Sequence, residues 1–466
     1  MTHRSLVVAA TAWDALCLHF AGSQDERMAF GFCGGIELEN FGQYLLREVD
    51  FPAEHEYRRR CRAFVSLKAE FAVPRAVRAR GCEAFLDVHS HPFARFPRPS
   101  HTDDEGALRQ ARLLRHLAPE ARLIRMVFSG SGQVWAEESA TESLQWSPIS
   151  EIVILGVDGR RVLVPVNISS PKAGLPDPRD ARTAVVIGDE AVATVRNLKV
   201  ILIGLGGVGS AVARLLAGYV DYLDLVDPDI IEAHNAPRLH FYAAGDEGQP
   251  KVEVVRREIL RAFPGSHVQT VQERFPSQNS LECFKRADFV FCCPDHNAVR
   301  YAVARDATRF MKPVIEVGCG GRRKDGKIVA LGYHVRLQVP CEACLACNGL
   351  DLSQLEDPST TEMKRRIGYL NDEGVVPGEL MPLTTKAAAD AVEIFFRYTT
   401  GYARSVPRNL YFDALHFRML DATTAYEPQP DCTLCGSAAG NLKGAGDRLS
   451  DDQRILTSPG GDYAVA

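Results

Sequence analysis

Two groups of residues in this chain could each support catalysis, and they imply different chemistries. In the first, His89 and His91 stand two positions apart in an extended segment, so both side chains point to the same side, and Asp103 follows soon after. Two imidazoles, a carboxylate and one position open to water make a catalytic zinc site. Because the bound water needs a proton acceptor and the oxyanion needs a donor, we assign Glu26 and Ser100 to these roles.

The second group starts at a glycine-rich turn, Gly204-Leu205-Gly206-Gly207-Val208-Gly209, between an apolar run and a helical stretch. Such a turn lets the backbone approach a phosphate and presents helix N–H groups to it. A dinucleotide dehydrogenase is one interpretation, with Asp227 at the end of the next strand binding ribose. The later residues Arg238, Lys251 and Asp295 suit a triphosphate with magnesium better. The chemistry would be attack on the α-phosphate of this triphosphate. In that reaction Lys251 and Arg238 neutralise the departing pyrophosphate, and Asp295 holds the metal.

Four of the thirteen cysteines form two C-x-x-C pairs, Cys341 with Cys344 and Cys432 with Cys435. In a reducing compartment such spacing favours metal binding over disulfides, and four thiolates fill a closed tetrahedral zinc site. With no position left for water, this zinc would be structural. Cys347 is a spare thiol that could compete as a ligand, and a redox pair is the alternative interpretation.

The composition restricts the class of protein. With 466 residues the chain is too long for one hydrophobic core, so two or three domains are expected. Its 54 basic and 59 acidic side chains nearly balance, which argues against a broad cationic surface for nucleic acid or an anionic membrane. No apolar run reaches the roughly 18 to 20 residues that a membrane helix requires, and the start of the chain does not resemble a secretory leader. We therefore expect a cytoplasmic protein.

Residues 1–150 are expected to form a small α/β domain. Apolar runs and helical spacing predict three strands and a helix there, at residues 82–88, 123–128, 134–136 and 107–117 respectively. A hairpin around Asp158-Gly159 and a polar, proline-containing stretch follow. We therefore assign residues 151–178 to a hairpin and linker.

Residues 179–437 alternate between short apolar runs and helical stretches, the pattern of a doubly wound parallel sheet. Four strands and three helices are predicted first, at 200–203, 223–226, 289–292 and 314–317, and at 208–216, 252–263 and 298–310. A long helix and two more strands complete the domain, at 385–398, 410–412 and 415–420. The tail, residues 438–466, is rich in Gly, Ser and Asp and is predicted to be mobile.

The histidine motif resembles that of the JAMM/MPN metallopeptidases, whose signature is an early glutamate, then His-Ser/Thr-His-Pro, then Ser-x-x-Asp. Over about residues 5–140 the resemblance implies that His89, His91 and Asp103 bind zinc. It also implies that Ser100 holds the oxyanion and that Glu26 is the general acid/base. Asp25 or Glu37 could take the place of Glu26. Eight residues separate the second histidine from the serine, one more than is common in the family, and a one-residue loop insertion would absorb this.

The second group resembles the motifs of ubiquitin-activating adenylyltransferases, especially the ThiF/MoeB family, over about residues 179–437. The matching motifs are the glycine loop, Asp227-Pro228-Asp229, Asn235-Ala236-Pro237-Arg238, Lys251 and Asp295. The resemblance implies that Asp227 and Asp229 bind the nucleotide, Asp227 through its ribose. Asn235, Arg238 and Lys251 are likewise implied to contact the phosphates. It also implies a structural zinc site of four cysteines and a homodimer in which Arg182 reaches into the neighbouring site.

One feature departs from that family. Members that transfer a ubiquitin-like protein onward often have a cysteine before the late helix, but Tyr369-Leu370-Asn371-Asp372-Glu373-Gly374-Val375 has none. Cys347, Cys319 and Cys292 are candidate substitutes, although a buried or structural thiol is the simpler interpretation of each. Adenylation without an enzyme thioester is therefore a serious alternative.

Both resemblances concern the C-terminus of a ubiquitin-like protein. The first hypothesis is a bifunctional prokaryotic enzyme that cleaves a precursor or conjugate with zinc and then adenylates the terminal glycine with ATP and magnesium. The second is a sulfur-carrier pathway, in which the adenylate accepts sulfur. A third, that one domain only binds the carrier, is disfavoured by the intact site residues. The expected partners are a ubiquitin-like or sulfur-carrier protein, a second copy of the chain and, in a conjugating pathway, a downstream conjugating enzyme.

Overall fold

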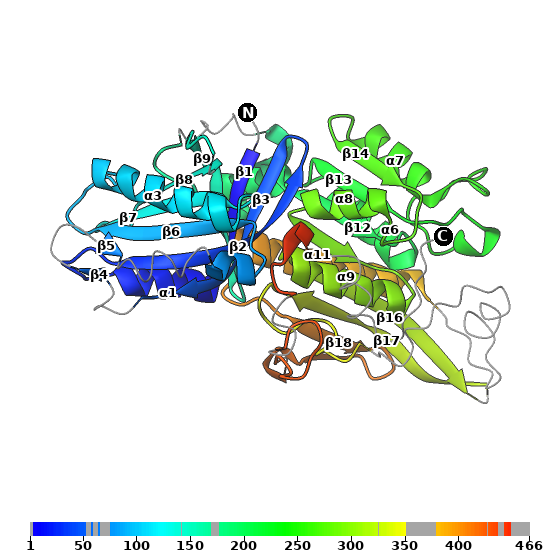
Figure 1. Ribbon diagram of the computed structural model, residues 1–466. Coiled ribbons are helices and arrows are strands. Elements are labelled where there is room, and N and C mark those ends of the chain that lie inside the picture. Colours follow the sequence, from blue (N-terminus) through cyan, green and yellow to red (C-terminus); the bar gives the residue numbers. More distant parts are fainter. Residues whose placement is uncertain are drawn as a thin grey trace.

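The computed structural model describes residues 3–52, 57–58, 64–65, 75–140, 142–168, 177–324, 326–350, 379–425, 427–436 and 442–448. They form two large β-sheets with flanking helices, which lie side by side (Figure 1). Most of the predicted linker, the cysteine-free segment 369–375 and the tail from residue 449 lie outside the described residues. Within the described part of the chain, no helix is long and apolar enough to cross a membrane.

The first sheet has nine strands in the order β11-β10-β1-β3-β2-β6-β7-β8-β9. Their bounds are β1 (His3–Ala9), β2 (Met28–Leu38), β3 (Phe41–Asp50), β6 (Ala84–His91), β7 (Arg122–Ser129), β8 (Val134–Ala140), β9 (Ser147–Pro148), β10 (Glu151–Gly156) and β11 (Gly159–Leu163). Helices α1 (Ala10–Phe20) and α3 (His101–Leu117) cover opposite faces of it (Figure 1). A small separate pair consists of β4 (Tyr57–Arg58) and β5 (Phe64–Val65).

Strand β2 lies in the middle of this sheet and is apolar along most of its length, because both of its faces are covered. Ala29 and Cys33 belong to the core that α1 covers, and Phe30 and Phe32 to the core that α3 covers. At Gly31 a Cβ would stand 2.8 to 2.9 Å from side-chain atoms of β3 and β6, so glycine lets these strands pack closely. The sequence patterns do not predict β1 to β3 or α1, since no alternation of polar and apolar residues marks them.

The predicted strands 82–88, 123–128 and 134–136 are confirmed as β6, β7 and β8. Helix α3 begins earlier than predicted because Ser100 caps it at its N-terminus. The predicted hairpin is present, with Gly156 opposite Gly159, but β10 pairs with β1 inside the first sheet. The strands of the first domain therefore continue to Leu163 rather than ending near residue 150.

The second sheet has eight strands in the order β14-β13-β12-β15-β16-β17-β18-β19. The first five are parallel: β14 (His267–Val271), β13 (Tyr222–Val226), β12 (Lys199–Ile203), β15 (Phe289–Cys292) and β16 (Val314–Lys324). An antiparallel extension follows: β17 (Lys327–Gln338), β18 (Asn409–Asp413) and β19 (Arg418–Asp421).

Helices cover both faces of this second sheet. On one face lie α6 (Gly207–Leu216), α7 (Lys251–Ala262) and α11 (Met381–Thr400), and on the other lie α8 (Gln278–Arg286) and α9 (Asn297–Phe310). Two short helices, α4 (Ala181–Ile187) and α5 (Asp189–Asn197), precede β12. The predicted doubly wound parallel sheet is confirmed, and the long strand β17 is an element that the sequence patterns missed.

The two sheets share one apolar core at their junction. The shared cluster contains side chains from both sheets and from α9, among them Val7, Leu45, Leu155, Ile201 and Phe310. Separating the sheets would expose this core to water and cost free energy, because apolar burial is the main stabilising contribution to a folded domain. The two domains therefore hold a defined position relative to one another.

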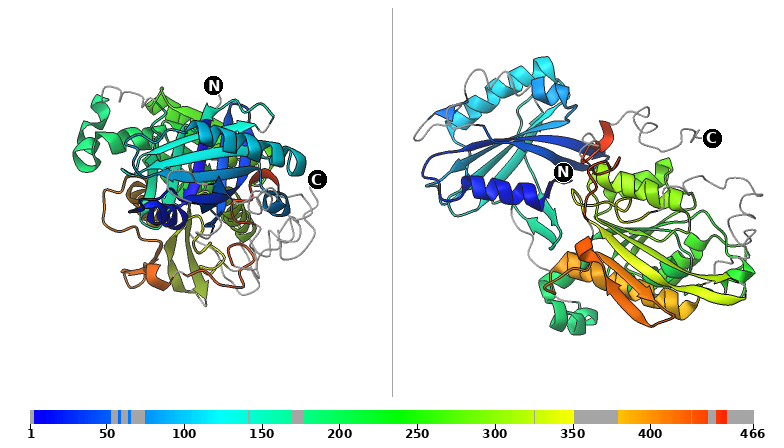
Figure 2. Two further views of the ribbon diagram at one scale, coloured as in Figure 1. Left: turned by 60° about the vertical axis from the view of Figure 1, so that its left-hand side comes forward. Right: turned by 90° about the horizontal axis from the view of Figure 1, so that it is seen from below.

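Residues 442–448 also lie at this junction, although they fall within the tail predicted to be mobile. The turn η7 (Gly446–Arg448), drawn in red, lies between β2 and α9 (Figure 2). The Arg309 guanidinium donates from Nε to the Gly446 carbonyl oxygen at 2.6 Å, and Leu442 is buried in the shared core. The prediction of a mobile tail is wrong for this segment, because hydrogen bonds and apolar burial fix it in place.

Candidate functional site

The glycine loop joins β12 to α6 in a turn that requires glycine. Gly204 has a φ of +89°, and a Cβ there would stand 2.7 Å from the carbonyl carbon of Cys293. At Gly209 a Cβ would stand 1.9 Å from the Gly204 carbonyl oxygen. A Cβ on Gly206, in contrast, would meet no described atom within 4 Å. The loop therefore leaves open space at the N-terminus of α6, where backbone N–H groups favour an anion.

The Asp227 carboxylate, directly after β13, braces this loop. It is buried and accepts one hydrogen bond from the Leu205 amide at 2.6 Å and another from the Asp229 amide at 2.9 Å. Burial raises the pKa of this carboxyl group, against the opposing charge of Lys251. Its position beside the loop is the one expected from the sequence, and a contact with ribose stays a prediction.

Lys251 is the first residue of α7 and brings its ammonium group to the same edge of the sheet. Its Nζ lies 2.7 Å from Asp229 Oδ2 and 3.9 Å from Asp227 Oδ1. Burial lowers the pKa of this lysine, but the carboxylates of Asp227 and Asp229 outweigh burial and raise the pKa above its ordinary value. Lys251 is therefore a fixed cation beside the glycine loop, suited to an anionic ligand.

Arg238 is paired with a residue that sequence reasoning missed. Its Nη1 lies 3.6 Å from Glu379 Oε2, and its buried Nε makes no hydrogen bond to the described residues. Glu379 also lies at the start of α6, since a Cβ on Gly207 would stand 2.9 Å from the same Oε2. Burial raises the pKa of Glu379, although the charge of Arg238 opposes this. A carboxylate thus lies where a phosphate would meet the helix, and no motif spacing could have revealed it.

Asp295 follows β15 and has a side chain that is 81% exposed. Its charge raises the pKa of both Lys251 and Glu379, so the three groups lie near one another at the edge of the sheet. The Asp295 carboxylate supplies hard oxygen ligands of the kind that magnesium prefers. The residues at this edge therefore fit a magnesium ion, which Asp295 would hold.

Asn235 has a different environment from the other residues of its motif. It is buried, and its Oδ1 accepts a hydrogen bond from the Glu232 amide at 3.0 Å. This contact closes the short turn η2 (Ala233–Asn235), and the Asn235 carbonyl oxygen then accepts from the Arg238 amide at 3.0 Å. Asn235 therefore shapes the turn that positions Arg238, and a phosphate contact of its own stays a prediction.

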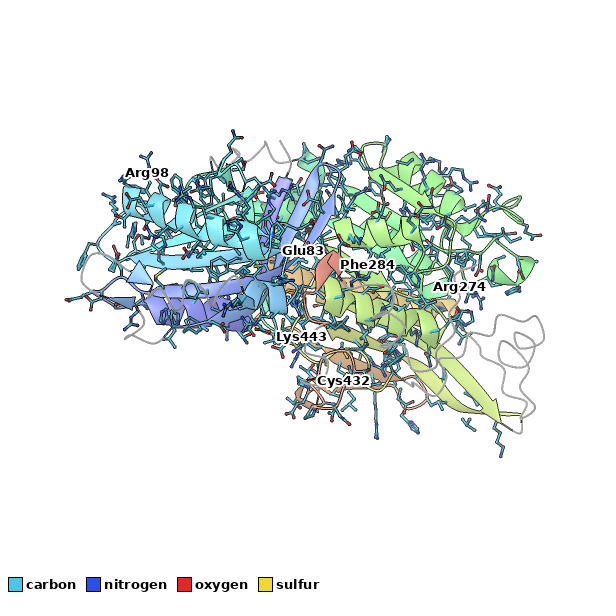
Figure 3. The ribbon with its side chains drawn as sticks, viewed as in Figure 1. Glu83, Arg98, Arg274, Phe284, Cys432 and Lys443 are labelled. Atoms are coloured by element: carbon cyan, nitrogen blue, oxygen red, sulfur yellow. The ribbon has the colours of Figure 1, made fainter. Side chains whose placement is uncertain are left out.

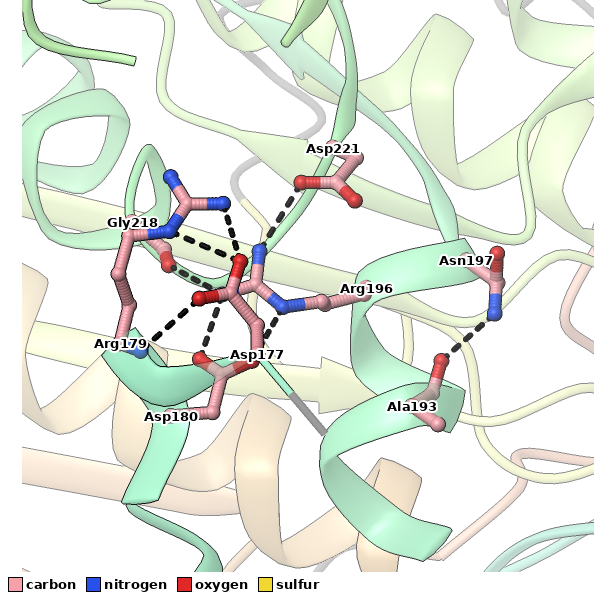
Figure 4. A network of polar contacts seen from close by, with 8 residues as sticks. All are labelled: Asp177, Arg179, Asp180, Ala193, Arg196, Asn197, Gly218 and Asp221. Atoms are coloured by element: carbon pink, nitrogen blue, oxygen red, sulfur yellow. Dashed lines mark hydrogen bonds and ion pairs between the residues drawn. The ribbon is translucent and has the colours of Figure 1, made fainter. Parts of the chain in front are cut away.

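Arg182 is exposed on α4, next to a network of ion pairs at the start of that helix (Figure 4). Arg196 donates from Nε to Asp180 at 2.6 Å and from Nη1 to Asp221 at 3.0 Å. This network ties α4 to α5 and to the start of β13. The reach of Arg182 into a neighbouring subunit stays a prediction.

In the first domain, His89 and His91 at the end of β6 face Asp103 on α3. Nε2 of His89 lies 3.4 Å from one carboxylate oxygen, and Nε2 of His91 lies 3.4 Å from the other. His89 is 6% exposed, and among the described residues its Nε2 finds no hydrogen-bond partner. Ligands at about 2.1 Å from a tetrahedral zinc ion lie roughly 3.4 Å apart. The predicted triad is therefore assembled, and its spacing and buried nitrogen fit zinc.

Glu26 lies two residues before Met28, the first residue of β2, and Met28 pairs with His89 on the neighbouring strand. Burial lowers the pKa of His89, but nearby carboxylates, Glu26 among them, raise it overall. Glu37 lies near the opposite end of β2, where its Oε1 accepts from the Arg4 guanidinium at 2.7 Å. The structure therefore places Glu26 beside the triad and removes Glu37 as a substitute.

Ser100 caps the helix that carries Asp103. Its hydroxyl accepts a hydrogen bond from the Asp103 amide at 3.3 Å, and the Asp103 carboxylate accepts one from the Ser100 amide at 2.5 Å. This reciprocal capping box holds the carboxylate where it faces the histidines. The hydroxyl therefore has a structural role beside the oxyanion role predicted for it.

Four cysteines converge in the second domain, but not the four first predicted. The cluster comprises Cys344, Cys347, Cys432 and Cys435, with Sγ–Sγ distances of 3.9, 3.6 and 3.3 Å for the pairs 344/347, 344/432 and 347/435 (Cys432 is labelled in Figure 3). Thiolates at about 2.3 Å from a tetrahedral zinc ion lie roughly 3.8 Å apart, so the set fits zinc. Cys341 lies outside the cluster, and its backbone turns at a φ of +67° just before it.

A glycine loop between a parallel strand and a helix, with Asp227, Lys251 and Asp295 at or beside neighbouring strand ends, defines a Rossmann-like nucleotide-binding domain. The profile of the ThiF family matches residues 179–434, and the chain belongs to this family. The sulfur carrier protein adenylyltransferase of Thermus thermophilus is 26% identical over 54% of this chain and 86% of its own length. The SAMP-activating enzyme E1 of Haloferax volcanii is 27% identical over 54% of this chain and 84% of its own length.

The adenylyltransferase and sulfurtransferase UBA4 of Lodderomyces elongisporus is 27% identical over 52% of this chain. The chain spans 50% of that relative, and 32% of the MOCS3 adenylyltransferase and sulfurtransferase of Drosophila willistoni. Among solved structures, Escherichia coli MccB with MccA-N7isoASN aligns with a TM-score of 0.46 at 21% identity, over 57% of this chain and 77% of that chain.

Proposed function

We propose that the second domain is an adenylyltransferase that activates the C-terminal carboxylate of a ubiquitin-like or sulfur-carrier protein with ATP. The observation that carries this proposal is the convergence of Arg238, Lys251 and Asp295 around an open glycine loop. Two cations beside a helix N-terminus suit a polyphosphate, whereas a nicotinamide cofactor would not need them. The Thermus relative, a sulfur carrier protein adenylyltransferase, and the Haloferax relative, a SAMP-activating enzyme E1, support the same class of substrate.

In the proposed reaction the carrier carboxylate attacks the α-phosphorus of ATP. The bond from that phosphorus to the bridging oxygen breaks, and pyrophosphate leaves with the electron pair. Lys251 and Arg238 stabilise the negative charge that grows on the leaving group. Asp295 would hold magnesium, which supplies further positive charge at the phosphates. Asp227 keeps the loop rigid, so that the N–H groups of α6 meet the nucleotide without rearrangement.

The described cysteines favour an adenylate that is consumed without an enzyme thioester. Of the three suggested substitutes, Cys347 lies in the four-cysteine cluster. Burial raises the pKa of Cys292 well above its ordinary value and that of Cys319 to about 12, so both stay protonated and unreactive near neutral pH. The cysteine-free segment 369–375 is outside the described residues. These thiols support the sulfur-carrier alternative, in which the adenylate passes directly to a sulfur donor.

We further propose that the first domain is a zinc peptidase of the JAMM/MPN type, which would cleave a precursor or conjugate of the same carrier. Its support is the assembled triad of His89, His91 and Asp103 with Glu26 nearby. Zinc at this triad would lower the pKa of a bound water, and Glu26 would take the proton. Ser100 would donate a hydrogen bond to the oxyanion.

The test measures ATP–pyrophosphate exchange and zinc content on one sample, with carriers ending in Gly-Gly from the same source. We expect carrier-dependent exchange that is lost in Asp295→Ala, and about two zinc ions per chain for the two proposed sites. We also propose that the protein is a homodimer, which sedimentation would measure, and that it is located in the cytoplasm. Zinc binding and carrier cleavage without any exchange would contradict the adenylyltransferase and leave the peptidase as the activity.

A further inference from the structure

The backbone just before Asp295 is held tightly where it passes the glycine loop. The Cys293 amide donates to the Ile203 carbonyl oxygen at 2.8 Å, at the end of β12. The Cys293–Pro294 peptide then packs against the glycine loop, where a Cβ on Gly204 would stand 2.7 Å from it. The residue before Asp295 therefore touches the loop that receives the nucleotide.

Arg300 holds the same peptide through two hydrogen bonds. Its guanidinium donates to the Pro294 carbonyl oxygen from Nε at 3.1 Å and from Nη2 at 2.9 Å. Arg300 lies on α9, and its own amide donates to the His296 carbonyl oxygen at 3.2 Å. The planar fork of an arginine fixes both the position and the orientation of an acceptor, which a lysine ammonium cannot do. Arg300 thus restrains the backbone directly before Asp295.

The guanidinium is anchored in turn by a buried carboxylate. Nη1 of Arg300 lies 3.2 Å from Glu316 Oε1, and Glu316 on β16 is 1% exposed. His334 Nε2 lies 3.0 Å from the same carboxylate, and Arg336 Nη1 lies 3.8 Å from it. Burial raises the pKa of Glu316, but His334 and Arg300 outweigh it and hold the pKa at about 2. Glu316 is therefore a permanently ionised anchor beneath the Asp295 loop.

We propose that Arg300, anchored by Glu316, is a positioning residue that sets Asp295 over the glycine loop for the binding of metal-bound nucleotide. A buried ion pair adds little stability on average, so stability alone does not account for this arrangement. The guanidinium is directed instead at one backbone oxygen, next to Asp295, whose exposed carboxylate has a contact with His296 Nε2 at 3.6 Å. The inference rests on the proposed function, because it assigns Asp295 to magnesium and ATP.

The test measures ATP binding by calorimetry in two buffers, one with EDTA and one with excess magnesium. Arg300→Lys keeps the charge for Glu316 but loses the fork that holds Pro294. We expect the Kd of magnesium–ATP to rise about tenfold, the usual effect of removing a group behind a metal ligand, and the Kd of ATP in EDTA to stay within about twofold. Arg305→Lys is the matched control, because Arg305 lies on the same helix but its guanidinium donates to Asp306 rather than to Pro294, and both dissociation constants should stay unchanged.

A double-mutant cycle separates positioning from general structure. Asp295→Asn should weaken magnesium–ATP binding, and adding Arg300→Lys to it should have no further effect, because Arg300 acts through Asp295. Urea denaturation of each variant beside the wild type checks that a weaker binding of magnesium–ATP is measured on folded protein.

Three outcomes would overturn the inference. They are unchanged magnesium–ATP binding in Arg300→Lys, an equal loss in both buffers, and additive effects of the two substitutions. A wild-type protein that binds magnesium–ATP normally but catalyses no exchange would contradict the adenylation alone. A wild-type protein that binds no ATP in either buffer would overturn the proposed function together with the role of Arg300.

Discussion

The Sγ atoms of Cys347 and Cys435 lie 3.3 Å apart, although 88 positions separate the two residues in the chain. This contact assigns Cys347 to the four-cysteine cluster and leaves Cys341 outside it. The cluster also lies close to the junction of the domains, because Cys435 packs in the same apolar core as Leu442 of the junction segment 442–448 (Lys443 is labelled in Figure 3). A zinc ion there would join the segment that follows β17 to the segment that follows β19.

The first prediction distinguishes the two cysteines. Cys347→Ser should remove about one zinc ion per chain and several kcal/mol of unfolding free energy, because the metal site has lost a ligand. Cys341→Ser, the matched control, should keep its zinc. Metal content by mass spectrometry and urea denaturation measure the two effects. Zinc loss in the Cys341 variant instead would mean that the pair first predicted from the sequence holds the metal.

The second prediction concerns the buried cation of the nucleotide site. Lys251→Met should lower ATP–pyrophosphate exchange at least about 100-fold, because the charge on the departing pyrophosphate loses its partner. Arg261→Met, on the exposed side of the same helix, should exchange at the wild-type rate, since its side chain is 80% exposed and pairs with Glu258. Equal rates for both variants would remove Lys251 from the reaction.

The third prediction concerns the carboxylate that lies at the start of α6. Glu379→Gln should tighten ATP binding about three- to tenfold, because an anion at a helix N-terminus beside Arg238 competes with phosphate. Glu393→Gln, an exposed change on α11, is the control. Weaker binding of magnesium–ATP in Glu379→Gln would indicate instead that Glu379 shares the metal with Asp295.

The fourth prediction separates the two roles of Ser100. Replacement by alanine removes the helix cap and should cost about 1 kcal/mol of stability, whereas glycine should cost only a few tenths. Both variants lose the hydroxyl, so both should cleave a peptide-extended carrier about 100-fold more slowly if Ser100 stabilises the oxyanion. If the cleavage rate instead follows stability, so that Ser100→Gly cleaves at close to the wild-type rate, Ser100 acts only as a helix cap.

The fifth prediction is a pH dependence at the domain junction. Lys312 is buried, its Nζ donates to Gln43 Oε1 at 2.9 Å, and burial lowers its pKa from 10.5 to about 8, although Asp288 opposes this. Between pH 8 and 10.5 Lys312 is largely neutral in the folded protein but protonated in the unfolded chain. Because the unfolded chain binds more protons, the unfolding free energy should rise with pH. Over this range wild type should gain roughly 3 kcal/mol at most relative to Lys312→Met. Denaturation of both proteins at several pH values measures the difference, and parallel curves would contradict it.

Much of the nucleotide site could be predicted because its residues follow short apolar strands. Asp227 comes directly after β13 and Asp295 three residues after the end of β15, and the carboxyl ends of parallel strands meet at one edge. The two histidines and Asp103 could be predicted for a similar reason, since a strand and the helix cap after it bring them together. Glu379 could not be predicted, because no local pattern connects it with the glycine loop.

The chemistry of each site was determined by the sequence itself, since it depends on residue types at short spacings: the glycine turn, the paired histidines and the C-x-x-C repeats. Only the tertiary structure decided between Cys341 and Cys347, because both fit the same spacing to Cys344 and packing alone selects one. It also decided that residues 442–448 are fixed and that Arg300 restrains the Asp295 loop. These features depend on contacts between distant segments, and such contacts form only when the apolar surfaces of both sheets are buried together.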